Sequence, residues 1–236
     1  GKELGYVSDL DIIFLYDDEH PDAADNYARF AQRINNWFNS LTNAGLLYET
    51  DLQLRPDGNS GLLVSSIDAF EEYQLHKAWL WEHQAISRAR FVAGNIRVGA
   101  MFTDIREKVL LQTRDQADLM KEVTSMREKM RMSHPPKAEL FDVKHDKGGI
   151  IDVEFMVQYL VLLHTHIHPQ LLANIGNIAL LHLLAELGMI EATLAERVAT
   201  AYRTYRKIIH STKLQAKEAK VPTIDIQHHQ TAVMTL

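Results

Sequence analysis

The stretch Gly5–Tyr16, GYVSDLDIIFLY, is the part of this sequence from which a fold and a chemistry are best predicted. It places two acids one residue apart, Asp9 and Asp11, directly before the apolar run Ile12–Tyr16. A short unbroken apolar run with β-branched residues predicts a strand that is covered on both faces. Because side chains alternate along a strand, we expect Asp9 and Asp11 to point the same way.

The paired acids have two interpretations. Like charges side by side repel, and burying them is costly without a counter-charge. Mg²⁺ would supply that charge, since it binds one or two carboxylates together with substrate phosphates. The alternative is an exposed, acidic start of a strand that nearby Lys or Arg side chains stabilise. The spacing alone favours neither interpretation.

A second alternating segment covers residues 46–55, LLYETDLQLR. Its polar members Glu49, Asp51, Gln53 and Arg55 share one predicted face. Such a face is ordinarily solvated, but it would also serve to line a cleft. The residues that follow, 56–61, have the composition of a turn, for which a simple hairpin loop is a sufficient explanation.

A helix is predicted between these two segments, at about 22–44, with Pro21 at its start and Gly45 at its end. Its apolar residues recur at helical spacing, and we expect them to pack in the core. They are Tyr27, Phe30, Ile34, Trp37, Phe38 and Leu41.

The segment that follows the turn predicts a short strand at 62–64 and a helix capped by Ser65 or Ser66. In the next block, AWLWEHQAISRAR, we expect Trp79, Ala85 and Ile86 to face the core. Its arginines, Arg88 and Arg90, would either neutralise a triphosphate or form surface ion pairs. A final short strand is expected at 91–93.

The chain becomes helical from about residue 96. Helices are predicted near 96–111, 114–132, 150–167, 175–187 and 190–213, with a short extended segment and a glycine turn before residue 150. An apolar stripe runs along 114–132, whereas residues 214–236 are polar and predict a loose tail or a truncated piece. Three histidines at 164, 166 and 168 cannot converge on a metal while a helix continues.

Composition excludes several classes of protein. The formal net charge of −6 and the pI near 6.1 argue against a general nucleic-acid binder. The chain has no cysteine, no apolar segment of membrane-spanning length and no recognisable signal peptide, so we expect a cytoplasmic protein. It reaches its acidic strand within ten residues, and we expect it to be a fragment of a longer protein.

Four blocks together resemble the glutamine synthetase adenylyltransferase family, within the polymerase β-like nucleotidyltransferase superfamily. They are GKELGYVSDLDIIFLY, LYETDLQLRPDGNSGLLVSS, AWLWEHQAISRARFVAG and DKGGIIDVEF. The resemblance implies an α+β fold: a nucleotidyltransferase domain with a small mixed sheet at 1–100, truncated at its N-terminus, and a helical bundle at 101–236. The residues of these blocks are similar to those of the C-terminal, adenylylating half of the proteins in that family.

The resemblance also implies site residues. Asp9, Asp11 and Asp51 would be catalytic and would hold Mg²⁺, although Glu49 shares the orientation of Asp51. Nucleotide-binding roles fall on the residues that match the family's phosphate-binding motifs: Gly1, Ser8, Arg55 and Arg88. A role at the face between the domains falls on Lys144, Asp152 and Glu154.

The function implied by the resemblance is transfer of AMP from ATP to a tyrosine of glutamine synthetase, controlled by glutamine and PII signal proteins. One alternative is the phosphorolytic removal of AMP, and another is uridylyl transfer to a PII-type protein. A third is a regulatory or docking fragment without catalytic activity.

Overall fold

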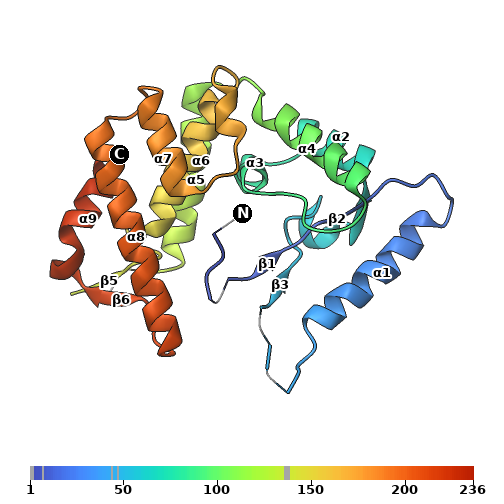
Figure 1. The fold of residues 1–236 in the computed structure, drawn as a ribbon, viewed down its shortest axis with the longest axis horizontal. Helices are drawn as coiled ribbons and strands as arrows, with labels where there is room; N and C mark the ends of the chain where they lie inside the picture. Colours follow the sequence, from blue (N-terminus) through green and yellow to red (C-terminus); the bar gives the residue numbers. More distant parts are fainter. Residues whose placement is uncertain (1–2, 7, 44, 47, 136–138) are drawn as a thin grey trace. The chain divides into compact units, whose positions relative to one another are not determined.

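The chain divides into two units in the computed structural model (Figure 1). One unit is Val7–Val109, and the other joins Gly1–Tyr6 to Leu110–Leu236. The structure describes residues 3–6, 8–43, 45–46, 48–135 and 139–236. Helices predominate and the strands are short, which confirms the predicted α+β class. The division at residue 100 into a catalytic and a helical domain stays a prediction.

The Val7–Val109 unit contains two parallel strand pairs, in which β1 pairs with β3 and β2 pairs with β4. Parallel neighbours require a crossover connection, and α1 lies in the segment that leads from β2 to β3. The elements of this unit are β1 (Leu10–Asp11), β2 (Phe14–Tyr16), α1 (Ala23–Phe38), β3 (Thr50–Asp51), β4 (Val64–Ser66), α2 (Ile67–His76), α3 (Leu80–Ser87) and α4 (Ile96–Leu110), with a 3-10 turn at Gly58–Ser60.

Helix α1 differs from its prediction in length and in packing. It ends at Phe38, well before Gly45, which instead closes a small turn with Thr42 at a φ of +93°. The only buried side chains that it contributes are Ala23 and Ala31, and its large apolar residues face outwards. The expectation that this aromatic stripe packs in the core was therefore wrong.

The helix start at Ser66 was predicted correctly, since the Ser66 side chain accepts a hydrogen bond from the Ala69 N–H at 3.3 Å. Ile67 and Phe70 of α2 are fully buried. In the next block, Ile86 is buried as expected, but Trp79 is 69% exposed, so its assignment to the core was wrong. Residues 91–93 form no strand in the structure.

The second unit is mainly helical, and its core lies among α6, α7, α8 and α9. Tyr202 and Tyr205 of α8 are fully buried there. The elements are α5 (Gln116–Met132), β5 (Leu140–Asp142), α6 (Ile150–His164), α7 (Asn177–Glu186), α8 (Ala192–Leu214), β6 (Lys220–Pro222) and α9 (Thr223–Thr235), with a 3-10 turn at Pro169–Leu172.

Two predictions for this unit have opposite outcomes. The stripe along α5 is confirmed, because Leu119 and Val123 are buried. The expected loose tail is wrong, because β6 pairs antiparallel with β5 and α9 buries Ile226 and Val233. The bundle therefore carries a small two-stranded ladder. No helix in the described part of the chain is long and apolar enough to cross a membrane.

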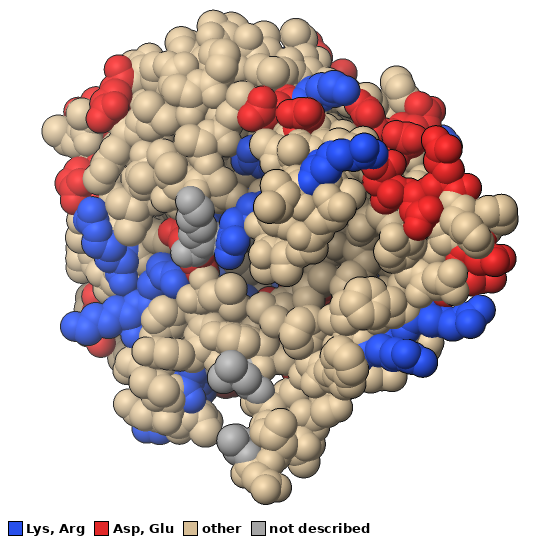
Figure 2. Space-filling view, turned by 45° about the vertical axis from the view of Figure 1, so that its right-hand side comes forward, with Lys and Arg blue, Asp and Glu red and all other residues tan. Residues whose placement is uncertain are grey.

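The surface charge is unevenly distributed on the face shown in Figure 2. Acidic side chains gather towards the right of that view, whereas lysines and arginines are scattered over it. The basic groups therefore form no continuous band on this face.

Candidate active site

Strands β1 and β3 bring two of the predicted acids directly together. Their parallel register places Asp11 opposite Asp51 and Leu10 opposite Thr50. The Leu10 N–H donates to the Glu49 carbonyl at 2.8 Å, and the Ile12 N–H donates to the Asp51 carbonyl at 2.9 Å. This ladder fixes the backbone of both acids, although 40 residues separate them in the sequence.

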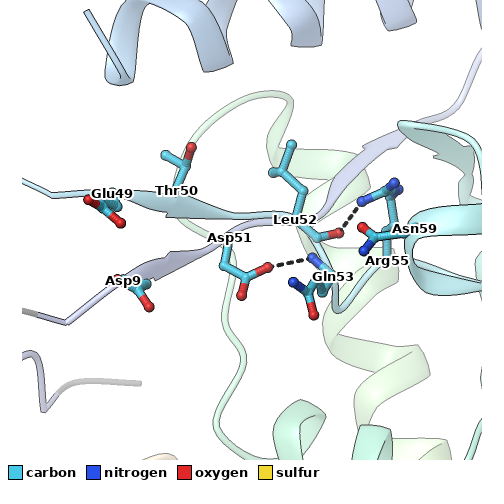
Figure 3. Close-up of a pocket in the computed structure, with 8 residues that line it drawn as sticks. All are labelled: Asp9, Glu49, Thr50, Asp51, Leu52, Gln53, Arg55 and Asn59. Atoms are coloured by element: carbon cyan, nitrogen blue, oxygen red, sulfur yellow. Dashed lines mark hydrogen bonds between the residues drawn. The ribbon is translucent and has the colours of Figure 1, made fainter. Parts of the chain in front are cut away.

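An open cavity of about 370 Å³ lies against this ladder (Figure 3). Asp9 and Asp51 point to one side of the strands, and Thr50 and Leu52 point to the other. The lining residues are Asp9, Glu49, Thr50, Asp51, Leu52, Gln53, Arg55 and Asn59. Alternation along residues 49–53 therefore places acidic groups beside a concave surface.

Asp51 lies on β3, and its carboxylate has a defined hydrogen-bond partner, whereas Glu49 precedes the strand. The Asp51 Oδ1 accepts a hydrogen bond from the Gln53 N–H at 2.7 Å, which orients the carboxylate (Figure 3). It is half-buried, whereas Glu49 is exposed. Glu49 and Asp51 are two residues apart, and both line the cavity. Mutagenesis of each residue would decide which of them is the third carboxylate of the site.

The electrostatics of the site centre on Asp11. Partial desolvation by the surrounding chain, followed by the charges of Asp51 and Asp9, raises the pKa of Asp11 above its ordinary value. The residue keeps contact with solvent, so this burial is incomplete. The carboxylates of Asp51 and Asp9 therefore both act against the negative charge of Asp11, an effect that a bound cation would relieve.

Carboxylate oxygens are ligands suited to Mg²⁺, so the chemistry of this donor set fits the expected metal. Within the described residues, however, no group of three or more acidic, histidine or cysteine side chains stands in an arrangement that could hold a metal ion. Metal binding by Asp9, Asp11 and Asp51 stays a prediction.

The loop after β3 is shaped by sterics. A Cβ added at Gly61 would lie 1.9 Å from the Pro56 carbonyl oxygen, so only glycine fits there. The Arg55 guanidinium donates to the Leu52 carbonyl at 2.6 Å and thereby braces the loop beside the cavity. These contacts explain the glycine and the arginine structurally, and a nucleotide-binding role for Arg55 stays a prediction.

Two other nucleotide-binding candidates, Ser8 and Arg88, are not among the residues that line the cavity. Both are half-buried, and Arg88 follows the last residue of α3, where its N–H donates to the Ala85 carbonyl at 3.0 Å. Gly1 lies outside the described residues. The nucleotide-binding roles of Ser8 and Arg88 stay predictions.

The candidates for the face between the domains belong to the helical unit. Asp152 accepts hydrogen bonds from Arg127 Nε at 2.5 Å and from the Gly148 N–H at 2.6 Å. Glu154 accepts one from the Tyr202 hydroxyl at 3.1 Å, and Lys144 is exposed. These contacts give Asp152 and Glu154 roles in packing, and their interdomain role stays a prediction.

Sequence reasoning missed three polar residues that support or line the site. Asn35 of α1 and Asn39, which caps its C-terminus, form hydrogen bonds of 2.6 Å with the Thr50 hydroxyl, and so hold β3 from the side opposite the acids. Asn59 reaches the cavity from the turn. The spacing of the two asparagines, one helical turn apart, was the available signal.

Two family models match consecutive parts of the chain and meet near residue 105, close to the boundary between the two units at residues 109 and 110. Residues 1–105 match the family model of glutamate-ammonia ligase adenylyltransferase. Residues 104–231 match the model described as GlnD PII-uridylyltransferase.

Curated relatives match nearly the whole chain, and they are named bifunctional glutamine synthetase adenylyltransferase/adenylyl-removing enzyme. The protein of Nitrosomonas europaea is 58% identical over 91% of this chain and 23% of its own length. That of Neisseria meningitidis serogroup A is 52% identical over 97% of this chain and 25% of its own length. That of Bordetella bronchiseptica is 52% identical over 94% of this chain and 24% of its own length. The chain thus spans about a quarter of the length of these relatives.

Proposed function

The chain belongs to the glutamate-ammonia ligase adenylyltransferase family, and we propose that it catalyses Mg²⁺-dependent transfer of AMP from ATP to a tyrosine of glutamine synthetase. The observation that carries this proposal is the register that sets Asp11 opposite Asp51, together with the cavity that Asp9 and Asp51 line. A phosphate-transfer site needs its charges fixed before the substrate arrives, and the β1–β3 ladder supplies that rigidity.

Asp9, Asp11 and Asp51 would hold the metal ions in this reaction. Bound Mg²⁺ would supply positive charge to the attacking oxygen and to the departing pyrophosphate. The tyrosine hydroxyl would lose its proton to solvent and its oxygen would form a bond to the α-phosphorus of ATP, while the bond from that phosphorus to the pyrophosphate oxygen breaks. The chain's own contribution is positioning, which in phosphoryl transfer accounts for much of the catalysis.

Nucleotide contacts are proposed for Arg55, which borders the cavity, and for Gly1, Ser8 and Arg88 by resemblance. ATP as donor, glutamine synthetase as substrate, control by a PII signal protein and a cytoplasmic setting all belong to this proposal. The names of the relatives support the substrate and the chemistry.

The reverse reaction is the second candidate, because the relatives' names include an adenylyl-removing activity. In that reaction phosphate would attack the α-phosphorus of the AMP–tyrosine linkage and release the tyrosine oxygen. Uridylyl transfer has weaker support, since the uridylyltransferase model matches only the part of the chain after the acidic cavity.

Two assays distinguish these directions. The first incubates the chain with ATP labelled at the α-phosphate, Mg²⁺ and unmodified glutamine synthetase, and we expect label to appear on the synthetase. The second incubates it with AMP-modified synthetase and inorganic phosphate, and we expect little release of the AMP group, which attack by phosphate would free as ADP. Release in the second assay without transfer in the first would assign the reverse reaction. If neither assay shows activity with a substrate that a full-length relative modifies, the chain would be interpreted as a docking fragment without catalytic activity.

A further inference from the structure

The described residues 3–6 lead into the acidic strand, yet they pack against the helical unit. Glu3 lies at the N-terminus of α7, where its Oε2 accepts hydrogen bonds from the Asn177 N–H at 3.2 Å and from Asn177 Nδ2 at 3.0 Å. A carboxylate at a helix N-terminus is stabilised by the unsatisfied N–H groups and by the helix dipole. Glu3 is thereby held to one end of α7.

The partner of Glu3 is itself held rigidly. Asn177 is fully buried, and its Nδ2 also donates to the Tyr202 hydroxyl at 2.7 Å. The Tyr202 hydroxyl in turn donates to Glu154 Oε1 at 3.1 Å. This chain of hydrogen bonds runs from α6 through α8 to α7, and it fixes the amide of Asn177 in the orientation that faces Glu3.

Further contacts hold the residues that follow Glu3. The Arg206 guanidinium of α8 donates to the Glu3 carbonyl at 3.2 Å and to the Leu4 carbonyl at 3.3 Å. The Tyr6 ring lies 5.0 Å from the His210 ring, measured between centroids. Side chains of α7 and α8 thus grip both the side chain of Glu3 and the backbone after it.

The shape of the helical unit is adapted to this contact. Gly176 has a φ of +91°, and a Cβ added to it would lie 3.0 Å from Glu3 Oε1. Gly188, at the other end of α7, has a φ of +74° but no neighbour within 4 Å of such a Cβ. Both glycines suit a left-handed backbone, but only Gly176 also makes room for Glu3.

We propose that Glu3 is a positioning residue for the acidic site, anchored by Asn177 and Arg206. Two residues separate Tyr6 from Asp9, so freedom at residues 3–6 would pass directly into the start of β1. Anchoring them removes that freedom before substrate binds, which is the preorganisation that a transfer reaction needs. The expected effect on catalysis rests on the proposed function. The expected effect on the order of residues 3–13 rests on the contacts alone.

The test compares two pairs of variants of this chain. Glu3→Ala removes the acceptor, whereas Glu3→Gln keeps an acceptor oxygen of the same reach. Gly176→Ala adds backbone strain and pushes on Glu3, whereas Gly188→Ala adds comparable backbone strain alone. For each variant we would measure hydrogen exchange of residues 3–13, the thermal midpoint, and kcat and KM for ATP in AMP transfer.

We expect Glu3→Ala and Gly176→Ala to speed exchange at residues 3–6 and at the Leu10 and Ile12 amides. We expect kcat to fall about tenfold in both, with KM for ATP changed less than about twofold. Glu3→Gln should stay near the wild type, and Gly188→Ala should lower the thermal midpoint without the other effects.

Three results would overturn the inference. The first is unchanged exchange at Leu10 and Ile12 in both Glu3→Ala and Gly176→Ala. The second is faster exchange with no fall in kcat. The third is a fall in kcat that Gly188→Ala reproduces at an equal thermal midpoint. If the wild-type chain transfers no AMP at all, the proposed function fails, and the exchange data alone still decide whether Glu3 orders β1.

Discussion

Asp11 is the side chain that links the sequence pattern most directly to the proposed chemistry. The alternation of residues 9–11 and 49–53 predicted acids that share a face, and the register of β1 with β3 places Asp11 opposite Asp51. The same alternation placed Gln53 on that face, but Asn59 could not be assigned to the cavity in this way. The position of Asn59 depends on a turn whose path is set by the close approach of Gly61 to Pro56, which no periodicity encodes.

Replacing Asp11 should separate activity from stability. Asp11→Asn removes a charge that Asp51 and Asp9 repel, so we expect its thermal midpoint in EDTA to equal or exceed that of the wild type. AMP transfer should fall at least about 100-fold. Mg²⁺ should raise the midpoint of the wild type and have less effect on the variant. A variant that keeps most of its activity with an unchanged midpoint would exclude Asp11 as a metal ligand.

Glu82 gives the stability of the Val7–Val109 unit a defined dependence on pH. It is buried at the start of α3, where it accepts hydrogen bonds from the Tyr73 hydroxyl at 3.1 Å and from the Trp79 N–H at 2.8 Å. Burial raises the pKa of Glu82 above 4.5. The folded state therefore binds this proton more tightly than the unfolded state does, and the stabilisation is lost as the pH rises through the folded pKa.

Glu82→Gln, which stays neutral, should accordingly gain stability relative to the wild type as the pH rises from about 4 to 7. The measurement is the free energy of unfolding in urea at several pH values. Asp104→Asn, at an exposed position of α4, serves as the control and should show a smaller trend. A difference between Glu82→Gln and the wild type that is independent of pH would contradict the effect of burial.

Among the helices, α1 and α9 are two in which the apolar periodicity of the sequence and the burial in the structure disagree. The apolar stripe of α1 has ideal helical spacing, yet Trp37 is 69% and Phe30 55% exposed. Residues 223–235 have a much weaker pattern, yet α9 packs on α8 and buries Ile226 and Val233. Periodicity predicts that a helix has an apolar face, but the partner of that face is a tertiary fact.

The exposure of α1 can be tested with two aromatic truncations. Trp37→Ala should change the free energy of unfolding by less than about 1 kcal/mol, because the side chain is already in water. Phe70→Ala, at a fully buried position of α2, should cost about 3–5 kcal/mol. Equal losses in urea unfolding would show that the α1 face is covered in solution.

The packing of α5 on α6 depends on a largely buried ion pair. The Arg127 side chain is 6% exposed and its Nε lies 2.5 Å from Asp152 Oδ1. Asp152→Ala would leave the guanidinium buried without its counter-charge, and we expect a loss of about 3–5 kcal/mol in unfolding free energy. Glu128→Ala, exposed on the same helix, should stay within about 0.5 kcal/mol of the wild type. Similar small losses in both variants would mean that Asp152 has a different role.

At the scale of the whole molecule, the sequence predicted the acidic strand region followed by helices because each region has its own period. It did not predict the anchoring of residues 3–6 on α7 and α8, since Glu3 and Asn177 are 174 residues apart. Contacts of that kind join segments whose local patterns are independent of one another.

The central claim is that Asp51 completes a carboxylate site for AMP transfer. The most direct test measures label transfer from α-labelled ATP to glutamine synthetase in Mg²⁺ by the wild-type chain, Asp51→Asn and Glu49→Gln. We expect transfer by the wild type and by Glu49→Gln, and a loss of at least about 100-fold in Asp51→Asn. Transfer by Asp51→Asn together with an inactive Glu49→Gln would contradict it and move the third carboxylate to Glu49.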